Sequence, residues 1–208
     1  MSPLLRCILT AFAFFAASAP AQAHLVETRL GDFYGGMLHP LTGFEDPLPW
    51  LALAILAAFQ DPKQLRWLLL VFPLGLLAGG ALSLVFPTLP FVTMLSLTLF
   101  VLIGLCVAVA RTLPSTLLIG LGLTVGLTHG YQNGQAMTDS TDHLLFILGV
   151  TSIGYVMVMM VTASAIAFLQ GQGARQGSWR AIALRAAGSW IAAIGLMVFG
   201  VQFLAPRV

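Results

Sequence analysis

Histidines and acids are scarce in this chain, and three short segments contain most of them. The segments are residues 39–46, 129–134 and 139–143. Imidazole and carboxylate groups without a thiolate suit Ni²⁺, Co²⁺, Zn²⁺ or Cu²⁺. The sequence therefore predicts a site for a divalent transition metal, bound as substrate or as ligand. The candidate metal ligands are His24, His39, Glu45, Asp46, His129, Asp142 and His143.

The first segment, HPLTGFED, is followed by prolines at positions 47 and 49, at the start of an apolar stretch. In a helix that starts near Met37, His39 and Asp46 share one face, because they are seven residues apart. Each proline would leave unpaired the carbonyl four residues before it. Inside a membrane, such carbonyls are tolerated where they line a cavity. The pattern predicts a cation vestibule at His39 and Asp46. The alternative is a kinked helix entry whose polar groups lie in water.

His129 ends an apolar segment with glycines at positions 122, 126 and 130. This spacing predicts that another helix packs closely against the segment. His129 should then face the bundle rather than lipid. A ligand role and a structural role at a helix end are both open for it.

Asp139, Asp142 and His143 stand near the start of a long apolar segment. Acids at a helix start also favour the helix dipole and cap its first turn. Capping accounts for the acids but not for His143. His24 differs from the others, because signal cleavage would make it the first residue, with an α-amine and an imidazole that can chelate a metal. The alternative is a first residue without a partner.

The elements that must position these groups are membrane helices. The chain has 208 residues, of which 59% are hydrophobic and 8% charged, whereas a soluble domain carries roughly 25% charged residues. It has no basic patch, which excludes nucleic acid as a partner. Residues 1–23 predict a cleaved signal peptide, because Arg6 precedes an apolar segment that ends in the small-x-small sequence Ala21-Gln22-Ala23. An uncleaved first helix is the alternative.

Residues 24–208 predict one all-α integral membrane domain, a bundle of six transmembrane helices. A span needs about 20 mostly apolar residues, and short linkers favour antiparallel neighbours in one bundle. The predicted spans are Met37–Phe59, Trp67–Phe86, Phe91–Ala110, Leu113–His129, His143–Leu169 and Ala181–Leu204.

The basic residues orient this bundle, because cytoplasmic loops are enriched in Lys and Arg. With a periplasmic N-terminus, the outer side holds only Arg29 and Arg207, and the inner side holds Lys63 and most of the arginines. All four histidines and six of the seven acids then lie on the outer side. We predict a multi-pass protein of the bacterial inner membrane with a periplasmic mature N-terminus and C-terminus.

The stretch FYGGMLHPLTGFED, followed by an apolar helix, resembles the HupE/UreJ family of nickel/cobalt permeases. The signal peptide ending in Ala-His and the six spans also fit, so the resemblance covers essentially the whole mature chain. The family's first motif reads HP-x-x-G-x-D-H. Here His39, Pro40 and Gly43 match it, whereas Glu45 takes the usual Asp place and Asp46 takes the usual His place.

The second motif of the family is typically HG-H-x-H-G. This chain keeps His129, Gly130 and Gly134, but Tyr131 and Asn133 occupy the histidine places. The later DHLLF, residues 142–146, is similar to a motif of a related branch and would restore one imidazole. The loss of nitrogen ligands implies a weaker site or a site for a harder ion.

The resemblance implies a secondary permease, not an enzyme, that takes nickel or cobalt from the periplasmic side, with zinc and copper as alternative metals. Its partners would be the metal ion, membrane lipid and proteins that mature a metalloenzyme. Further passage inward would depend on backbone carbonyls, water and hydroxyls such as those of Ser83, Thr98, Thr124 and Ser164.

Two other functions fit the same residues. The lost motif histidines favour a non-transporting metal-binding accessory or assembly protein of the same fold. A membrane metallohydrolase would hold zinc with His39, His129, His143 and Asp46, because a catalytic zinc takes three protein ligands and keeps one position open.

Overall fold

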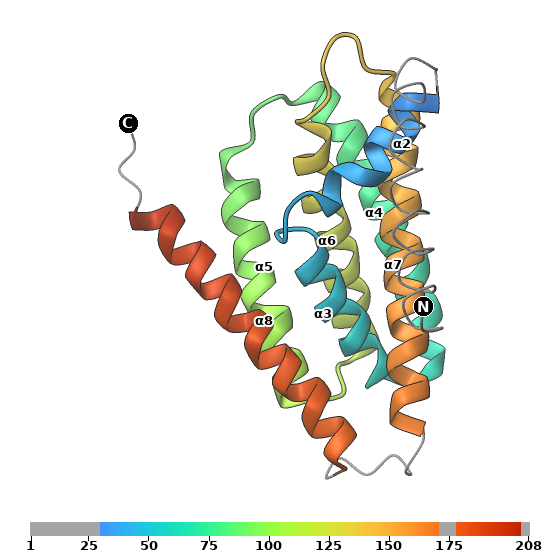
Figure 1. Cartoon of the computed structure of the whole chain (residues 1–208), viewed down its shortest axis with the longest axis vertical. Helices are drawn as coiled ribbons and strands as arrows, with labels where there is room; N and C mark the ends of the chain where they lie inside the picture. Colours follow the sequence, from blue (N-terminus) through green and yellow to red (C-terminus); the bar gives the residue numbers. More distant parts are fainter. Residues whose placement is uncertain (1–29, 171–177, 205–208) are drawn as a thin grey trace, which may run out of the picture.

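The computed structural model describes residues 30–170 and 178–204, and within these ranges it contains helices and no strand. The predicted signal peptide (residues 1–23) and His24 lie outside the described residues. Figure 1 shows the helices as one elongated bundle, with α8 inclined to the others. The elements in chain order are α2 (Leu30–Leu38), the 3-10 turn η2 (His39–Leu41), α3 (Pro47–Ala58), α4 (Pro62–Val85), α5 (Pro90–Val109), α6 (Ser115–Gly134), α7 (His143–Gln170) and α8 (Trp179–Leu204).

Four of these helices, α4, α5, α7 and α8, are long and apolar enough to cross a membrane. The chain is therefore a multi-pass membrane protein. Six spans were predicted from the sequence, and four helices within the described ranges have the length and hydropathy of a span. Helix α3 is apolar but has only 12 residues, and glycines and the polar segment THGYQNG lower the hydropathy of α6.

The predicted single span from Met37 to Phe59 is wrong. Helix α2 and η2 end before Thr42, residues 42–46 are not helical, and α3 begins only at Pro47. The expected shared helical face of His39 and Asp46 is therefore not formed.

The two prolines begin α3 rather than kink a longer helix. Pro47 and Pro49 lie in its first turn, where an N–H has no partner within the helix, so a proline costs nothing there. The backbone N–H groups of Leu48 and Trp50, next to each proline, donate to Phe44 O and Asp46 O. The predicted release of carbonyls from a continuous helix consequently does not apply.

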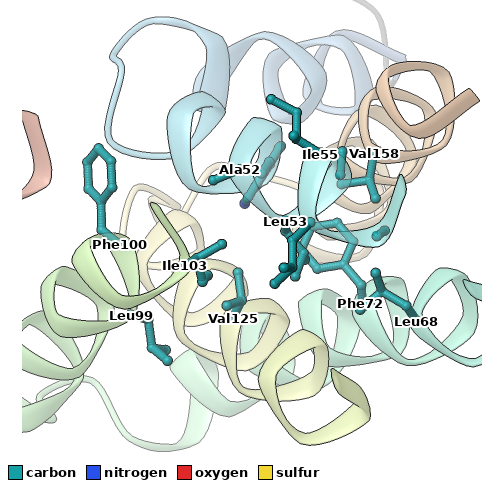
Figure 2. Close-up of a cluster of buried hydrophobic side chains, with 14 of the residues drawn as sticks. Ala52, Leu53, Ile55, Leu68, Phe72, Leu99, Phe100, Ile103, Val125 and Val158 are labelled. Atoms are coloured by element: carbon teal, nitrogen blue, oxygen red, sulfur yellow. The ribbon is translucent and has the colours of Figure 1, made fainter. Parts of the chain in front are cut away.

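Helix α3 is the centre of the bundle. Its residues 52–57 are buried on every side, as expected for a helix that is apolar all round. Figure 2 shows Leu53 of α3 among Phe72, Ile103 and Val125, which come from α4, α5 and α6. The surrounding helices thus hold the start of α3, at Asp46, inside the bundle.

Glycines bring α4 and α6 into backbone contact. A Cβ added at Gly75 would lie 2.7 Å from Leu123 O, and one added at Gly126 or Gly130 would collide with the backbone carbonyl of Phe72 or Leu76. The predicted packing role of the glycine stripe is confirmed. It turns the side of α6 that carries His129 toward the interior.

The charged residues separate between the two ends of the bundle. Five described cations lie at the lower end in Figure 1, near the start of α4, the α5–α6 linker and the first turns of α8. Of the described acids, all but Asp61 lie toward the opposite end, on α2, before α3 or before α7. The five cations are Lys63, Arg66, Arg111, Arg180 and Arg185.

Candidate cation-binding pocket

A pocket of about 170 Å³ opens where the chain enters α3. Its wall comes from η2, from the end of the 42–46 loop and from the last turn of α6. In Figure 1 this is the region where the connection between α2 and α3 meets the upper part of α6. The residues that line the pocket are His39, Glu45, Asp46, Gln132 and Asn133.

Asp46 joins the start of α3 to α6. Its Oδ1 lies 2.5 Å from His129 Nδ1, and its Oδ2 accepts a hydrogen bond of 2.9 Å from Asn133 Nδ2. The Asp46 side chain is 19% exposed and that of His129 only 1%. A carboxylate at the N-terminus of a helix is also favoured by the helix dipole. Two of the three segments that are rich in candidate ligands, residues 39–46 and 129–134, are therefore in contact.

His129 has a neighbour at each ring nitrogen. Besides Asp46 at Nδ1, the Ser96 hydroxyl lies 3.4 Å from Nε2. The indole ring of Trp50 packs against the imidazole, with 6.1 Å between ring centroids. A carboxylate on one nitrogen fixes the tautomer and orientation of an imidazole. His129 is therefore a rigid, buried group.

Asn133 completes the cluster, although its place in the sequence indicated only a lost motif histidine. Its Nδ2 also donates to His129 O at 2.9 Å, and its side chain is 2% exposed. Within the described part of the chain, its Oδ1 has no hydrogen-bond partner. Its position four residues after His129, on the same helix face, was the signal that could have identified it. Ser96 was detectable as a polar residue within an apolar span.

His39 and Glu45 form the more accessible wall of the pocket. Glu45 is exposed and His39 is partly buried. The His39 ring lies against Phe146 of α7, with 5.8 Å between ring centroids. Glu45 also borders an apolar groove beside α8.

Asp142 and His143 lie outside the pocket lining. Asp142 caps α7, because its Oδ1 accepts from Leu145 N at 3.1 Å. Its own N–H donates to Asp32 Oδ2 at 2.8 Å and so ties α7 to α2. His143 is exposed on the first turn of α7. Asp142 thus has the capping role that the sequence left open.

Residues 30–170 and 178–204 contain no group of three or more His, Cys, Asp or Glu side chains placed to hold one metal ion. The zinc arrangement of a hydrolase, with His39, His129 and His143 around one ion, is therefore not formed in this part of the chain. The structure pairs His129 with Asp46 instead and leaves His143 exposed.

The hydroxyls proposed for an inward path bond within their own helices. Thr98, Thr124 and Ser164 donate to the carbonyls of Met94, Gly120 and Met160 at 2.7, 2.7 and 2.8 Å. Ser83 donates to Gly80 O at 2.7 Å. Thr98 and Ser164 are also exposed. Along α3, one and two turns after Asp46, come the fully buried Trp50 and Leu53. An apolar core therefore follows the pocket.

Comparison with known proteins identifies the family. No curated protein and no solved structure matches the chain. A family model described as HupE / UreJ protein matches residues 12–198, a range that includes every residue of the pocket. Because this match covers most of the 208 residues, the chain belongs to the HupE/UreJ family.

Proposed function

We propose that this protein is a secondary permease for a divalent transition-metal ion, nickel or cobalt, taken from the periplasmic side of a bacterial inner membrane. Its family and its four apolar helices support a transport-related membrane protein. The observation that carries the proposal is the ion-pair geometry of Asp46 and His129 inside this bundle. Ionisable groups at such positions are costly and mark ion pathways.

The broken start of α3 supports an ion site at the same place. Discontinuous helices form the substrate and ion sites of many transporters, because their free ends present polar backbone and side-chain groups inside the membrane. Here α3 begins at Pro47, directly after Asp46, and the pocket lies against this start. Glu45 adds a second carboxylate at its wall.

The charge separation supports the orientation. Cytoplasmic ends of membrane helices are enriched in Lys and Arg, so the end with the described cations faces the cytoplasm. The pocket then opens toward the periplasm. The sequence contains no nucleotide-binding motif, so the energy for transport would come from an ion gradient or from a partner protein.

A non-transporting metal-binding accessory protein is the second candidate. The apolar core below Asp46 favours it, because Trp50 and Leu53 leave no polar route along α3 in this conformation. A permease must move α3 against its neighbours to open such a route, as alternating access requires.

Nickel uptake into proteoliposomes that contain the full chain tests the proposal. A permease gives time-dependent accumulation that Asp46→Asn abolishes and Asp139→Asn, an exposed acid outside the pocket lining, preserves. Nickel binding without accumulation would identify the accessory protein. Absence of both binding and accumulation would exclude a role with nickel, and the same assay with cobalt completes the test.

A further inference from the structure

We infer that the pocket takes its divalent cation as the hydrated ion and holds it through the water shell, not through direct bonds to histidine nitrogen. This inference rests on the proposed function and specifies the form in which the substrate binds. It follows from the partners of each side chain and from the size of the pocket.

Two of the side chains suited to direct metal bonds, His129 and Asp46, are already engaged. His129 is 1% exposed, with Asp46 at Nδ1 and Ser96 at Nε2. Both carboxylate oxygens of Asp46 contact α6 side chains, one at His129 and one at Asn133. A direct bond to His129 would require the displacement of a buried partner, and an unsatisfied buried polar group costs about 1–3 kcal/mol.

The remaining wall offers too few ligands to replace a water shell. Among the described residues, His39 and Glu45 are the other ionisable side chains that line the pocket, and no three-residue ligand group exists in residues 30–170 and 178–204. Protein sites that bind transition metals directly use three or four side chains. Two ligands would leave the metal mostly bound to water.

The pocket has room for that water. Its volume of about 170 Å³ is enough for several water molecules. A hydrated divalent ion carries a first shell of similar size. The pocket therefore does not require the ion to lose its water in order to enter.

The wall is suited to accept hydrogen bonds from metal-bound water. Glu45 and Asp46 offer carboxylate oxygens, and Gln132 offers an amide oxygen. Asn133 also lines the pocket, and its Oδ1 is a buried acceptor without a partner in the described part of the protein, which a small shift of the side chain would present to this water. The water ligands of a cation are strong donors, and hydrogen bonds to ionised groups are stronger than neutral ones. Such a pocket selects by charge and hydrated size.

Competition with hexaamminecobalt(III) tests this inference. This ion resembles a hydrated metal ion in size and presents N–H donors, but its six ammonia ligands do not exchange, so it cannot bond directly to the protein. We expect it to displace nickel from the full chain in lipid nanodiscs at a concentration no more than about tenfold above that of nickel. Mg²⁺, which also keeps its water, should compete as well.

Two variants localise the competition. Glu45→Gln should weaken nickel and hexaamminecobalt(III) binding by a similar factor, because both ions would use the same carboxylate. Asp139→Asn, which removes an exposed acid outside the pocket lining, should leave both affinities unchanged. Equal losses in the two variants would place the binding on the general surface charge and would overturn the inference.

Bound Co²⁺ gives an independent readout. An octahedral, water-ligated ion keeps the weak absorption of the aqueous ion, whereas a four-coordinate site with imidazole gives an intense, shifted band. If nickel binds but hexaamminecobalt(III) does not compete and Co²⁺ shows the intense band, the inference is wrong and the proposed function stands. If neither ion binds, both are wrong.

Discussion

The two ends of α3 are both tied to neighbouring helices, but by different chemistry. Beyond its C-terminal end, the neutral side chain of Gln60 donates to Leu56 O and Arg111 O at 3.0 and 3.3 Å and accepts from Leu113 N at 2.8 Å. Every polar atom of this side chain has a partner. At the start of α3, a carboxylate and a buried imidazole meet, and Asn133 Oδ1 lacks a partner among the described residues.

This difference separates a structural anchor from a binding site. A buried amide with all its hydrogen bonds made contributes to stability at little electrostatic cost. Buried ionisable groups are expensive by comparison, and an unused acceptor beside them adds to the cost. The end near Gln60 is built for stability, whereas the end near Asp46 accepts a cost that a bound cation would offset.

The largest effect is expected from a change that disturbs the packing of α4 against α6, because α6 carries the partners of Asp46. Gly130→Ala places a Cβ against the backbone of Leu76 and forces α4 and α6 apart. We expect a loss of about 3 kcal/mol in stability, together with loss of nickel binding. Thermal unfolding in detergent and nickel titration measure both. Gly120→Ala is the matched control, because its added Cβ meets no atom of the described residues within 4 Å.

Asp46→Asn should remove the charge at the start of α3 and disrupt its contacts with α6. The variant keeps the shape of the side chain but removes the charge and places an N–H₂ group where Asp46 now accepts hydrogen bonds from His129 and Asn133. We expect nickel affinity to fall at least about tenfold and stability to fall by about 2 kcal/mol. Unchanged nickel affinity, measured by titration calorimetry, would contradict the role of Asp46 in the pocket.

Gln60→Ala should disrupt only the hydrogen bonds at the C-terminal end of α3. It removes three hydrogen bonds to backbone groups, and we expect a loss of about 1–2 kcal/mol in stability. Nickel affinity should stay the same, because Gln60 lies at the far end of α3. Gln135→Ala, at an exposed glutamine, is the control for the loss of an amide. A matching loss of nickel affinity in Gln60→Ala would show that the two ends are not independent.

Asn133→His should give the smallest change in free energy of the four variants, and it tests how the pocket binds nickel. It adds an imidazole beside Asp46 at a position where the resembled motif carries histidine. We expect nickel to gain a direct nitrogen bond and about tenfold in affinity, or about 1.4 kcal/mol, while hexaamminecobalt(III) gains nothing. A parallel gain for both ions would argue against a direct bond, and the Co²⁺ absorption band checks the result.

The length and apolar composition of the segments were sufficient to predict several helices of the bundle. The predicted span Phe91–Ala110 differs from α5 by one residue at each end, and His143–Leu169 ends one residue before α7 does. The glycine stripe of α6 was predicted to pack, and it packs on α4. These features depend on local apolar runs, so the sequence alone could identify them.

The break before α3 was missed because two signals compete in HPLTGFEDPLPW. The seven-residue spacing of His39 and Asp46 fits a helix, but an acid followed by Pro47 is also a helix start, and the structure follows the second signal. The pairing of Asp46 with His129 joins residues 83 positions apart, and no local pattern determines such a contact.

The short length of α3 bears on how the protein is assembled. Its 12 residues extend about 18 Å, whereas the hydrocarbon core of a bilayer is about 30 Å thick. Such a segment, preceded by Glu45 and Asp46, cannot settle alone as a span during synthesis. Helices α4 to α7, made later, supply the walls around it. The walls that bury α3 and complete the pocket are therefore available only after the helices that follow α3 in the sequence have been made.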